Sequence, residues 1–520
     1  MLSSKAPLCR GQRSINHACQ SRCRTLPPLR AAARQQLEVD VVVIGAGIIG
    51  LMTAQSLLRE NLSVALVERK QLGAGATGAG QGYIWMSHRT PATPAWELAA
   101  HSTALWRSLT AAGPAHAAAI QWQGNGSLLV ARTASESQAL RERQALLLQH
   151  GVTAEFYSAA GTPDTTATGS SGSSGSSGGR GGGGGGGGGG HGGVNVLEPA
   201  LRLPREGAAL LVEGDAQING RLAAAVLLSE CRASPLFHVF LDEPMEHLEL
   251  DHRIVGRCGL MVAAGVWSAQ ILADATAETG WAGMLQPRRG HLLELLQPPA
   301  GMPVIKHGIM EMAYTKHYSD AHARGSTRTP EAQSSSSSSS SSSSTTHTTS
   351  QPTSAPLLGL TSEIDITFTA TTSATGSLLI GSSREFSGWE STPSLDIIYA
   401  IMDRASLFLP HLSEVPASAL VGTTRVGLRP FATHGLPMIG PVPGCPGVFV
   451  AAGHEGSGLS LGPATSEIIK HYITSSIGHT DLGHSSQQPA SSAVASLLNP
   501  DLLSALLPAT HLHAARTPVR

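Results

Sequence analysis

The N-terminal part of the chain alternates short apolar runs with polar turns in a strand–helix–strand order. Residues 39–44 read VDVVVI, a mostly β-branched run that is typical of a buried parallel strand. We expect a helix from Leu51 to about Glu60 and a second strand over residues 63–67. Parallel strands joined by a helix predict an α/β fold with a doubly wound sheet.

The same pattern returns near the other end of the chain. Residues 448–451 read VFVA and predict another buried strand, and a helix is expected from Leu461 to about Tyr472. The turn between them, GHEGSG over residues 453–458, is rich in glycine. An ordinary strand-to-helix turn is the alternative, but two glycine-rich turns of this kind in one chain favour a shared binding role.

Long segments lack the apolar positions that folding requires. One contains the unbroken run Gly181–Gly190, and another contains the run Ser334–Ser344. Such segments bury too little apolar surface to offset the entropy of ordering them, so we expect surface insertions. Of the 520 residues, roughly 370 then remain, enough for a two-domain enzyme.

The first 36 residues are basic and contain no acidic residue, the first being Glu38. This composition is typical of an organelle transit peptide and lacks the apolar core of a secretory signal. We therefore expect import into an organelle, a chloroplast in preference to a mitochondrion, with a disordered tail as the alternative. The net charge of −1 indicates no nucleic-acid partner, and the chain has no apolar stretch of about 18 residues that would indicate a transmembrane segment.

The motif GAGIIG at residues 45–50 lies between the first strand and its helix. Gly45 allows the tight turn, Gly47 lets the backbone approach a pyrophosphate, and Gly50 lets the helix pack closely on the sheet. Glu68 follows the second strand, where a carboxylate can accept hydrogen bonds from ribose hydroxyls and disfavours NADP. A ligand-free glycine turn is the alternative, and the motif alone does not separate FAD from NAD.

A second run of small residues, GAGATGAGQG, occupies residues 73–82. It would let the backbone pass close to a bulky ligand, which a flavoenzyme needs and an NAD enzyme does not. A flexible low-complexity patch is the alternative.

These residues resemble the D-amino-acid-oxidase-type FAD oxidoreductases, which include glycine oxidase, sarcosine oxidase and D-amino-acid dehydrogenase. The resemblance extends to MVAAGVWS at Met261–Ser268, PRRGHLLEL at Pro287–Leu295 and the long block Gly427–Leu461. It implies a glutathione-reductase-like, doubly wound parallel sheet for FAD and an antiparallel-sheet substrate domain. It also implies the following cofactor-binding residues: Gly45, Gly47, Ile48, Ile49, Gly50, Glu68, Arg69, Ala76, Thr77, Gly80, Gln81, Gly82, Ala264, Gly265, Gly453, Ser457, Gly458 and Leu459.

The domain organisation follows from the resemblance and the insertions. One insertion interrupts the FAD-binding domain, which also carries part of the substrate domain. A second insertion interrupts the segment that forms most of the substrate domain. The expected order is a transit peptide (1–36), the FAD-binding domain (37–158 and 194–285) with a Gly/Ser-rich insertion (159–193), the substrate domain (287–425) with a Ser-rich insertion (319–356), a C-terminal FAD-binding segment (426–475) and a tail (476–520).

The implied reaction is oxidation of the C–N bond of a small amine or amino acid by hydride transfer to flavin N5, with O2 or another electron acceptor. Arg429 resembles the arginine that binds the substrate carboxylate, and a structural salt bridge is its alternative role. Tyr314, expected in a strand-like segment, is a second candidate for the pocket or, equally, a core tyrosine. Glu455 and Gly456 depart from the family pattern, which leaves the substrate open and allows an amine without an α-carboxylate.

Two other function classes fit parts of the pattern. An FAD monooxygenase would share the first half of the fold and would need NAD(P)H. A non-catalytic flavin-binding protein would explain residues 231–260, which are short and poorly patterned, as if strands were reduced or a segment lost. Lys306 and Lys316 could promote oxygen reactivity if they lie near the flavin.

Cysteine and histidine usage indicates no metal site and no disulfide framework. The chain after residue 36 keeps Cys231, Cys258 and Cys445, with no CxxC pair. Of these only Cys445 lies near the C-terminal block, in a turn, so we expect non-covalent FAD. Most of the histidines are expected to face solvent.

Overall fold

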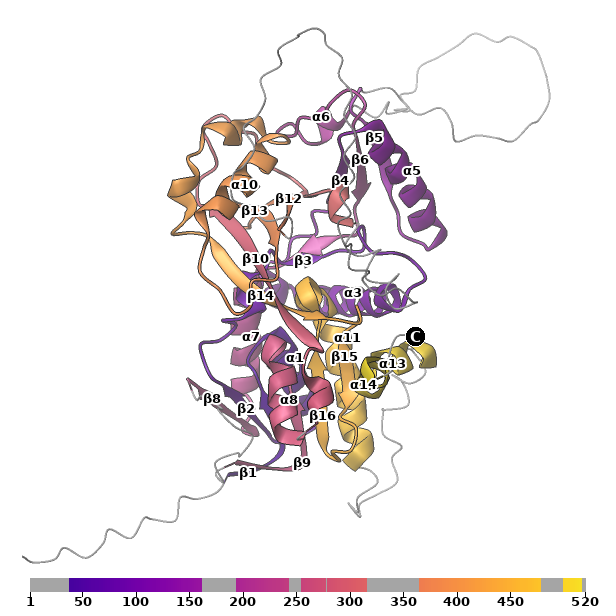
Figure 1. Ribbon diagram of the computed structural model, residues 1–520, viewed down its shortest axis with the longest axis vertical. Coiled ribbons are helices and arrows are strands. Elements are labelled where there is room, and N and C mark those ends of the chain that lie inside the picture. The colour runs from indigo at the N-terminus through magenta and orange to yellow at the C-terminus, as the bar shows by residue number, and fades with distance from the viewer. Residues whose placement is uncertain are drawn as a thin grey trace, which may run out of the picture.

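The computed structural model describes residues 37–160, 193–242, 254–276, 278–315, 364–477 and 499–516. Two large sheets dominate these residues, one in the lower half of Figure 1 and one in the upper half. The expected transit peptide and nearly all of the two insertions lie outside the described residues. Import into an organelle therefore stays a prediction.

The first sheet contains six strands in the order β15-β16-β9-β1-β2-β8. Its neighbouring strands are parallel, except that β15 and β16 are antiparallel. The strands are β1 (Leu37–Ile44), β2 (Val64–Glu68), β8 (Phe237–Leu241), β9 (Ile254–Val262), β15 (Met438–Pro441) and β16 (Val448–Ala452). This mostly parallel sheet confirms the predicted α/β fold class.

The chain between 231 and 260, where reduced strands were a concern, supplies two members of this sheet. β8 pairs with β2 at one edge, and β9 pairs with β1 in the middle. Residues 243–253 between them lie outside the described part of the chain. The weak sequence pattern therefore did not mean that this region lacks strands.

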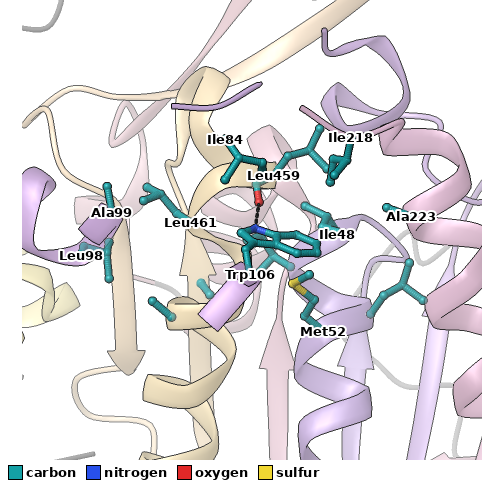
Figure 2. Close-up of a cluster of buried hydrophobic side chains, with 14 of the residues drawn as sticks. Ile48, Met52, Ile84, Leu98, Ala99, Trp106, Ile218, Ala223, Leu459 and Leu461 are labelled. Atoms are coloured by element: carbon teal, nitrogen blue, oxygen red, sulfur yellow. Dashed lines mark hydrogen bonds between the residues drawn. The ribbon is translucent and has the colours of Figure 1, made fainter. Parts of the chain in front are cut away.

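Helices cover the parallel sheet and join it to the C-terminal block. α1 (Ile48–Arg59) packs against α11 (Gly458–Ile477), which also contacts α3 (Pro94–Ala112). Trp106 of α3 is fully buried at this junction, and its indole N–H donates to the carbonyl oxygen of Leu459 at 2.9 Å (Figure 2). No helix within the described ranges is both long and apolar enough to cross a membrane.

The second sheet contains eight strands in the order β14-β10-β13-β12-β11-β4-β6-β5. All of its pairs are antiparallel except β11 with β4. The strands are β4 (Ser127–Ala131), β5 (Glu155–Ser158), β6 (Ala208–Val212), β10 (Leu285–Leu295), β11 (Gly308–Glu311), β12 (Asp365–Thr372), β13 (Leu378–Arg384) and β14 (Arg425–Ala432). β6 and β14 come from segments that the sequence assigned mainly to the FAD-binding domain.

One face of this sheet is covered by α10 (Leu395–Ser406), around a stacked pair of buried phenylalanines, Phe368 and Phe408. The remaining elements connect and cover the two sheets. They are α2 (Ala76–Ala79), β3 (Tyr83–Ile84), α4 (Pro114–Ala119), α5 (Ala134–Gln149), α6 (Val194–Leu197), β7 (Ala216–Gln217), α7 (Gly220–Arg232), α8 (Ser268–Thr276), α13 (Pro500–Leu506) and α14 (Pro508–Arg516).

Candidate active site

A cavity of about 550 Å³ lies between the two sheets, at the carboxyl ends of the parallel strands. Ligands of open α/β sheets bind at this edge, and the volume is within the usual range for small-molecule sites. The elements that line it are the ends of β1, β2, β9 and β16, the second glycine-rich segment, and β10 and β14 of the antiparallel sheet. The cavity therefore brings together the sequence segments that were singled out separately.

Most of the predicted cofactor-binding residues line this cavity. Three of them do not: Gly50, Gly453 and Ser457. The lining residues from the prediction are Gly45, Gly47, Ile48, Ile49, Glu68, Arg69, Ala76, Thr77, Gly80, Gln81, Gly82, Ala264, Gly265, Gly458 and Leu459. Their roles toward a cofactor stay predictions.

The first glycine turn needs each of its glycines for a different physical reason. Gly45 has a φ of +105°, and a Cβ there would lie 2.5 Å from the carbonyl oxygen of Ala263. A Cβ on Gly50 would lie 2.0 Å from the carbonyl oxygen of Gly45, so this glycine lets the helix pack on the turn. A Cβ on Gly47 would meet only Thr77 Oγ1, at 3.4 Å, and Gly47 lines the cavity. The turn thus leaves room on the side where a pyrophosphate would bind.

The Glu68 carboxylate is fixed at the edge of this turn. Oε2 accepts a hydrogen bond from the Ala46 amide at 2.8 Å, and Oε1 accepts one from the Lys70 amide at 2.8 Å. Glu68 lines the cavity, so its remaining acceptor capacity faces the position expected for ribose hydroxyls. The residues present therefore fit an adenine dinucleotide.

The second glycine-rich segment is an ordered part of the wall and not a low-complexity patch. Gly82 has a φ of +95°, and a Cβ there would lie 1.9 Å from the carbonyl oxygen of Ile218. Next to it, Gln81 accepts a hydrogen bond from Thr369 Oγ1 of β12 at 2.9 Å. Close packing therefore dictates the small residues, and Gln81 links this segment to the antiparallel sheet.

The C-terminal turn forms a further part of the wall. Gly453 takes a φ of +89°, a 3-10 turn follows at Glu455–Ser457, and α11 begins at Gly458. His454 also lines the cavity, and its Nε2 lies 3.0 Å from Thr465 Oγ1. Burial lowers the pKa of His454 to about 3, so its imidazole is neutral near pH 7.

Arg429 extends from β14 into the cavity. Its Nη1 donates to the carbonyl oxygen of Ser383 at 3.0 Å, and the guanidinium lies against the backbone of β10 at Gly290. A Cβ on Gly290 would lie 2.5 Å from Arg429 Cζ. The absence of a side chain on β10 therefore creates the space that the arginine occupies.

Two further arginines and a glutamate lie around Arg429. Glu455 lines the cavity at a φ of +47°, and its Oε1 is 3.5 Å from Arg288 Nη1. Burial alone would raise the pKa of Glu455, but Arg429, Arg384 and Arg288 together hold that pKa below its ordinary value. Arg384 in turn pairs with Asp365 at 2.8 Å. Among these five groups, the three guanidiniums outnumber the two carboxylates by one.

Tyr314 lines the same end of the cavity, but it does not lie in a strand as expected. It belongs to a 3-10 turn, Met312–Thr315, that directly follows β11. The guanidinium of Arg384 stacks on its ring, with Cζ 3.8 Å from the centroid. The strand assignment was wrong because the apolar run that begins in β11 continues into the turn without a break in pattern.

His291 is a lining residue that the sequence did not identify. Its Nε2 accepts the Ser394 amide at 3.1 Å, so Nδ1 carries the proton and donates to Ser383 Oγ at 3.0 Å. Burial, with Arg289 and Arg429 nearby, lowers the pKa of His291 to about 4. A histidine inside the apolar run of PRRGHLLEL was the available signal.

The expectation that most histidines face solvent does not hold for four of the thirteen histidines in the described part of the chain. His88, His291, His454 and His511 are all buried. The expectation came from their abundance alone, which says nothing about which of them fall on buried positions of strands and helices.

The remaining candidates lie away from the cavity lining. Cys231, Cys258 and Cys445 are free thiols, and none of the three lines it. Lys306 is exposed and does not line it either, and Lys316 lies outside the described residues. Non-covalent cofactor binding therefore stays the prediction.

The two sheets, the glycine turn with its acid, and the cavity between them define an α/β protein of the dinucleotide-binding class. A family model described as FAD dependent oxidoreductase matches residues 40–180 and 190–471. The chain belongs to this family.

Curated relatives match over shorter stretches. The glycine oxidase of Pseudomonas putida is 36% identical over 99 residues, which is 19% of this chain and 26% of that protein. The tRNA 5-methylaminomethyl-2-thiouridine biosynthesis bifunctional protein MnmC of Chromohalobacter salexigens is 36% identical over 146 residues, 26% of this chain and 20% of that protein. The matched stretches thus span about a quarter of these relatives or less.

Solved structures resemble the whole fold. The glycine oxidase from Bacillus cereus has a TM-score of 0.60 at 18% identity, covering 84% of this chain and 98% of that one. The iminodiacetate oxidase from Chelativorans has a TM-score of 0.57 at 19% identity, covering 84% and 95%. At sequence identities this low, the structural similarity establishes a common fold and no more.

Proposed function

We propose that this protein binds FAD non-covalently and oxidises the C–N bond of a small amine that carries a carboxylate, that is, an amino acid or an N-substituted amino acid. Membership of the FAD dependent oxidoreductase family supports the cofactor, and glycine oxidase relatives support the substrate class. The basic, acid-free residues 1–36 support import into an organelle, with a chloroplast preferred.

The residues of the first turn would hold the cofactor's pyrophosphate and ribose. The N-terminus of α1 offers a partial positive charge at Gly47, and Glu68 offers acceptor oxygens. Leu459 and Gly458, at the start of α11, line the cavity from the C-terminal block. When bound, the flavin supplies the acceptor for the substrate's hydride.

The observation that carries the substrate proposal is the position of Arg429. It is an arginine of the cavity lining, and it belongs to a group of three arginines and two carboxylates that together carry one net positive charge. One substrate carboxylate would balance that charge and could bind the planar guanidinium through two hydrogen bonds. This favours a carboxylate-bearing substrate over a plain amine, which the unusual Glu455 had left open.

Orientation and electrostatics would account for most of the catalysis by the protein. The two histidines of the lining, His291 and His454, are neutral and are held by hydrogen bonds to Ser383 and Thr465. Arg429 would hold the substrate's carboxylate so that its Cα–H has one orientation in the cavity. Re-oxidation by O2 or by another acceptor completes the proposed turnover.

A comparison of two substrates in one variant tests this proposal. Arg429→Lys should lower kcat/KM for an amino acid such as alanine roughly 10- to 100-fold, because a charge-assisted, two-point contact becomes a single one. We expect only low activity with ethylamine, which has no carboxylate, and the variant should leave that activity unchanged.

Arg425→Lys is the matched control, because Arg425 lies on the same strand, pairs with Glu294 and does not line the cavity. This control should leave kcat/KM unchanged for both substrates. Equal losses for alanine and ethylamine in the Arg429→Lys enzyme would contradict a carboxylate-binding role.

A further inference from the structure

An exposed tryptophan from the antiparallel-sheet half of the molecule stacks on a wall of the cavity. Trp389 lies between β13 and α10 and is 52% exposed. Its ring centroid is 5.6 Å from that of Trp267, with 23° between the ring planes. Trp267 belongs to the 3-10 turn Gly265–Trp267, which follows β9, and it lines the cavity. The stack therefore joins the two halves of the molecule beside the cavity.

Arg69 is the second partner of Trp267. Its Cζ lies 4.0 Å from the centroid of the Trp267 ring, a cation–π contact. Arg69 directly follows Glu68, and both line the cavity. The group of Arg69, Trp267 and Trp389 thus lies on the side of the cavity where the ribose-binding acid is found.

The segment that carries Trp389 is anchored at both ends. The Arg289 Nε donates to Glu385 Oε1 at 2.7 Å, and the backbones of these two buried residues also bond to each other. At the other end, the Ser394 amide donates to His291 Nε2 at 3.1 Å. Trp389 therefore lies on a loop whose two ends are held by hydrogen bonds. A singly exposed aromatic side chain needs no explanation by itself. Trp389 differs because its ring stacks on Trp267, a residue of the cavity lining.

We propose that Trp389 is a positioning residue for the adenosine side of FAD. It fixes Trp267 as the cavity wall beside Glu68 and Arg69 and thereby slows release of the cofactor. The inference rests on the proposed binding of FAD, but not on the identity of the amine. Because Trp389 comes from the antiparallel-sheet half, cofactor retention depends on contact between the two halves.

Titration of the full-length apoprotein with FAD, followed by flavin fluorescence, tests this role. Trp389→Ala should raise the dissociation constant roughly three- to tenfold, the range expected when an aromatic stack is lost. ADP, which carries only the adenosine end, should lose affinity by the same factor. Trp389→Phe should restore most of the affinity, because a phenyl ring can still stack on Trp267. Tyr399→Ala removes another exposed aromatic ring, from α10, and should leave the affinity unchanged.

A double-mutant cycle shows whether Trp389 acts through Trp267. Trp267→Ala alone should weaken FAD binding, and adding Trp389→Ala should then change the dissociation constant by less than about twofold. Additive losses would overturn the proposal, and so would a Trp389→Ala protein that binds FAD within about twofold of the parent protein. If FAD binds but no amine is oxidised, only the proposed function fails. If the protein takes up no FAD, both fail.

Discussion

Arg429 reaches the cavity because the residue beneath it on the neighbouring strand is Gly290. β10 and β14 are paired so that Gly290 lies opposite Gly427, two residues along the strands from the Arg288–Arg429 pair. In such an antiparallel ladder, the side chain of one residue covers the backbone of its diagonal neighbour. The direction of the arginine is thus set by a glycine, and not only by hydrogen bonds.

Replacing that glycine should disturb substrate binding without removing a charge. In Gly290→Ala the new methyl group would occupy the position of the guanidinium, so we expect KM for an amino acid to rise roughly tenfold with little change in kcat. Steady-state kinetics of the FAD-loaded protein measures both constants. Gly422→Ala, where a Cβ would meet nothing within 4 Å, is the control. An unchanged KM in Gly290→Ala would contradict this account of how Arg429 is positioned.

Sequence reasoning succeeds for residues whose chemistry is tied to a fixed spacing. Gly45, Gly47, Glu68 and Arg429 reach the cavity as expected, because each belongs to a motif with a known place on strand or turn, whereas Gly50 of the same motif packs against Gly45. His291 and Trp389 were missed, because their significance depends on partners that are far away in the sequence. Ser394 is 103 residues from His291, and Trp267 is similarly remote from Trp389.

Within the first glycine turn, between β1 and α1, neighbouring glycines serve either packing or ligand binding. Gly50 faces the backbone of Gly45, whereas Gly47 faces the cavity. The two glycines therefore have different reasons to lack a side chain, one for folding and one for the ligand.

Alanine at these two positions should give opposite results. Gly50→Ala should lower the unfolding free energy by about 1–3 kcal/mol, the usual cost of overpacking, because its Cβ would clash with the Gly45 carbonyl oxygen. Gly47→Ala should keep the melting temperature of the apoprotein but weaken FAD binding about tenfold. Thermal unfolding and FAD titration of both variants check this. A stable Gly50→Ala, or a destabilised Gly47→Ala with normal FAD affinity, would contradict the assignment.

Helices and strands were predictable where the apolar pattern of the sequence ends sharply. The strand–helix–strand unit after residue 37 and the strand and helix near the C-terminus match the structure to within a few residues. The turn at Tyr314 and the strands β8 and β9 could not be predicted in this way, because their sequences lack a clear hydrophobic periodicity. β8 and β9 are strands because β2 and β1 pair with them, which is a tertiary effect.

At the scale of the whole molecule, burial of neutral histidines links stability to pH. Burial lowers the pKa of His291 and of His511 to about 4 and that of His454 to about 3, and it lowers the pKa of His88 as well. In the unfolded chain these imidazoles titrate near 6.5, so below that pH the unfolded state binds protons that the folded state does not.

The free energy of unfolding should therefore fall as the pH is lowered from about 6.5 toward 4, by up to ~1.4 kcal/mol per pH unit for each such histidine. Urea unfolding of the full chain at several values between pH 7.5 and 5 measures the slope. His511→Gln, away from the cavity lining, should make the slope shallower. A stability that stays constant or rises on acidification would contradict the neutral, buried state of these side chains.

The proposed reaction transfers a hydride from an amino acid to a flavin bound between the two sheets. It can be followed in the absorbance spectrum of the FAD-loaded protein mixed with candidate amino acids and N-methyl amino acids without oxygen. At least one of these compounds should bleach the oxidised-flavin band, and NADPH should not. A protein that takes up no FAD, or whose flavin is reduced only by NADPH, would contradict the proposed reaction.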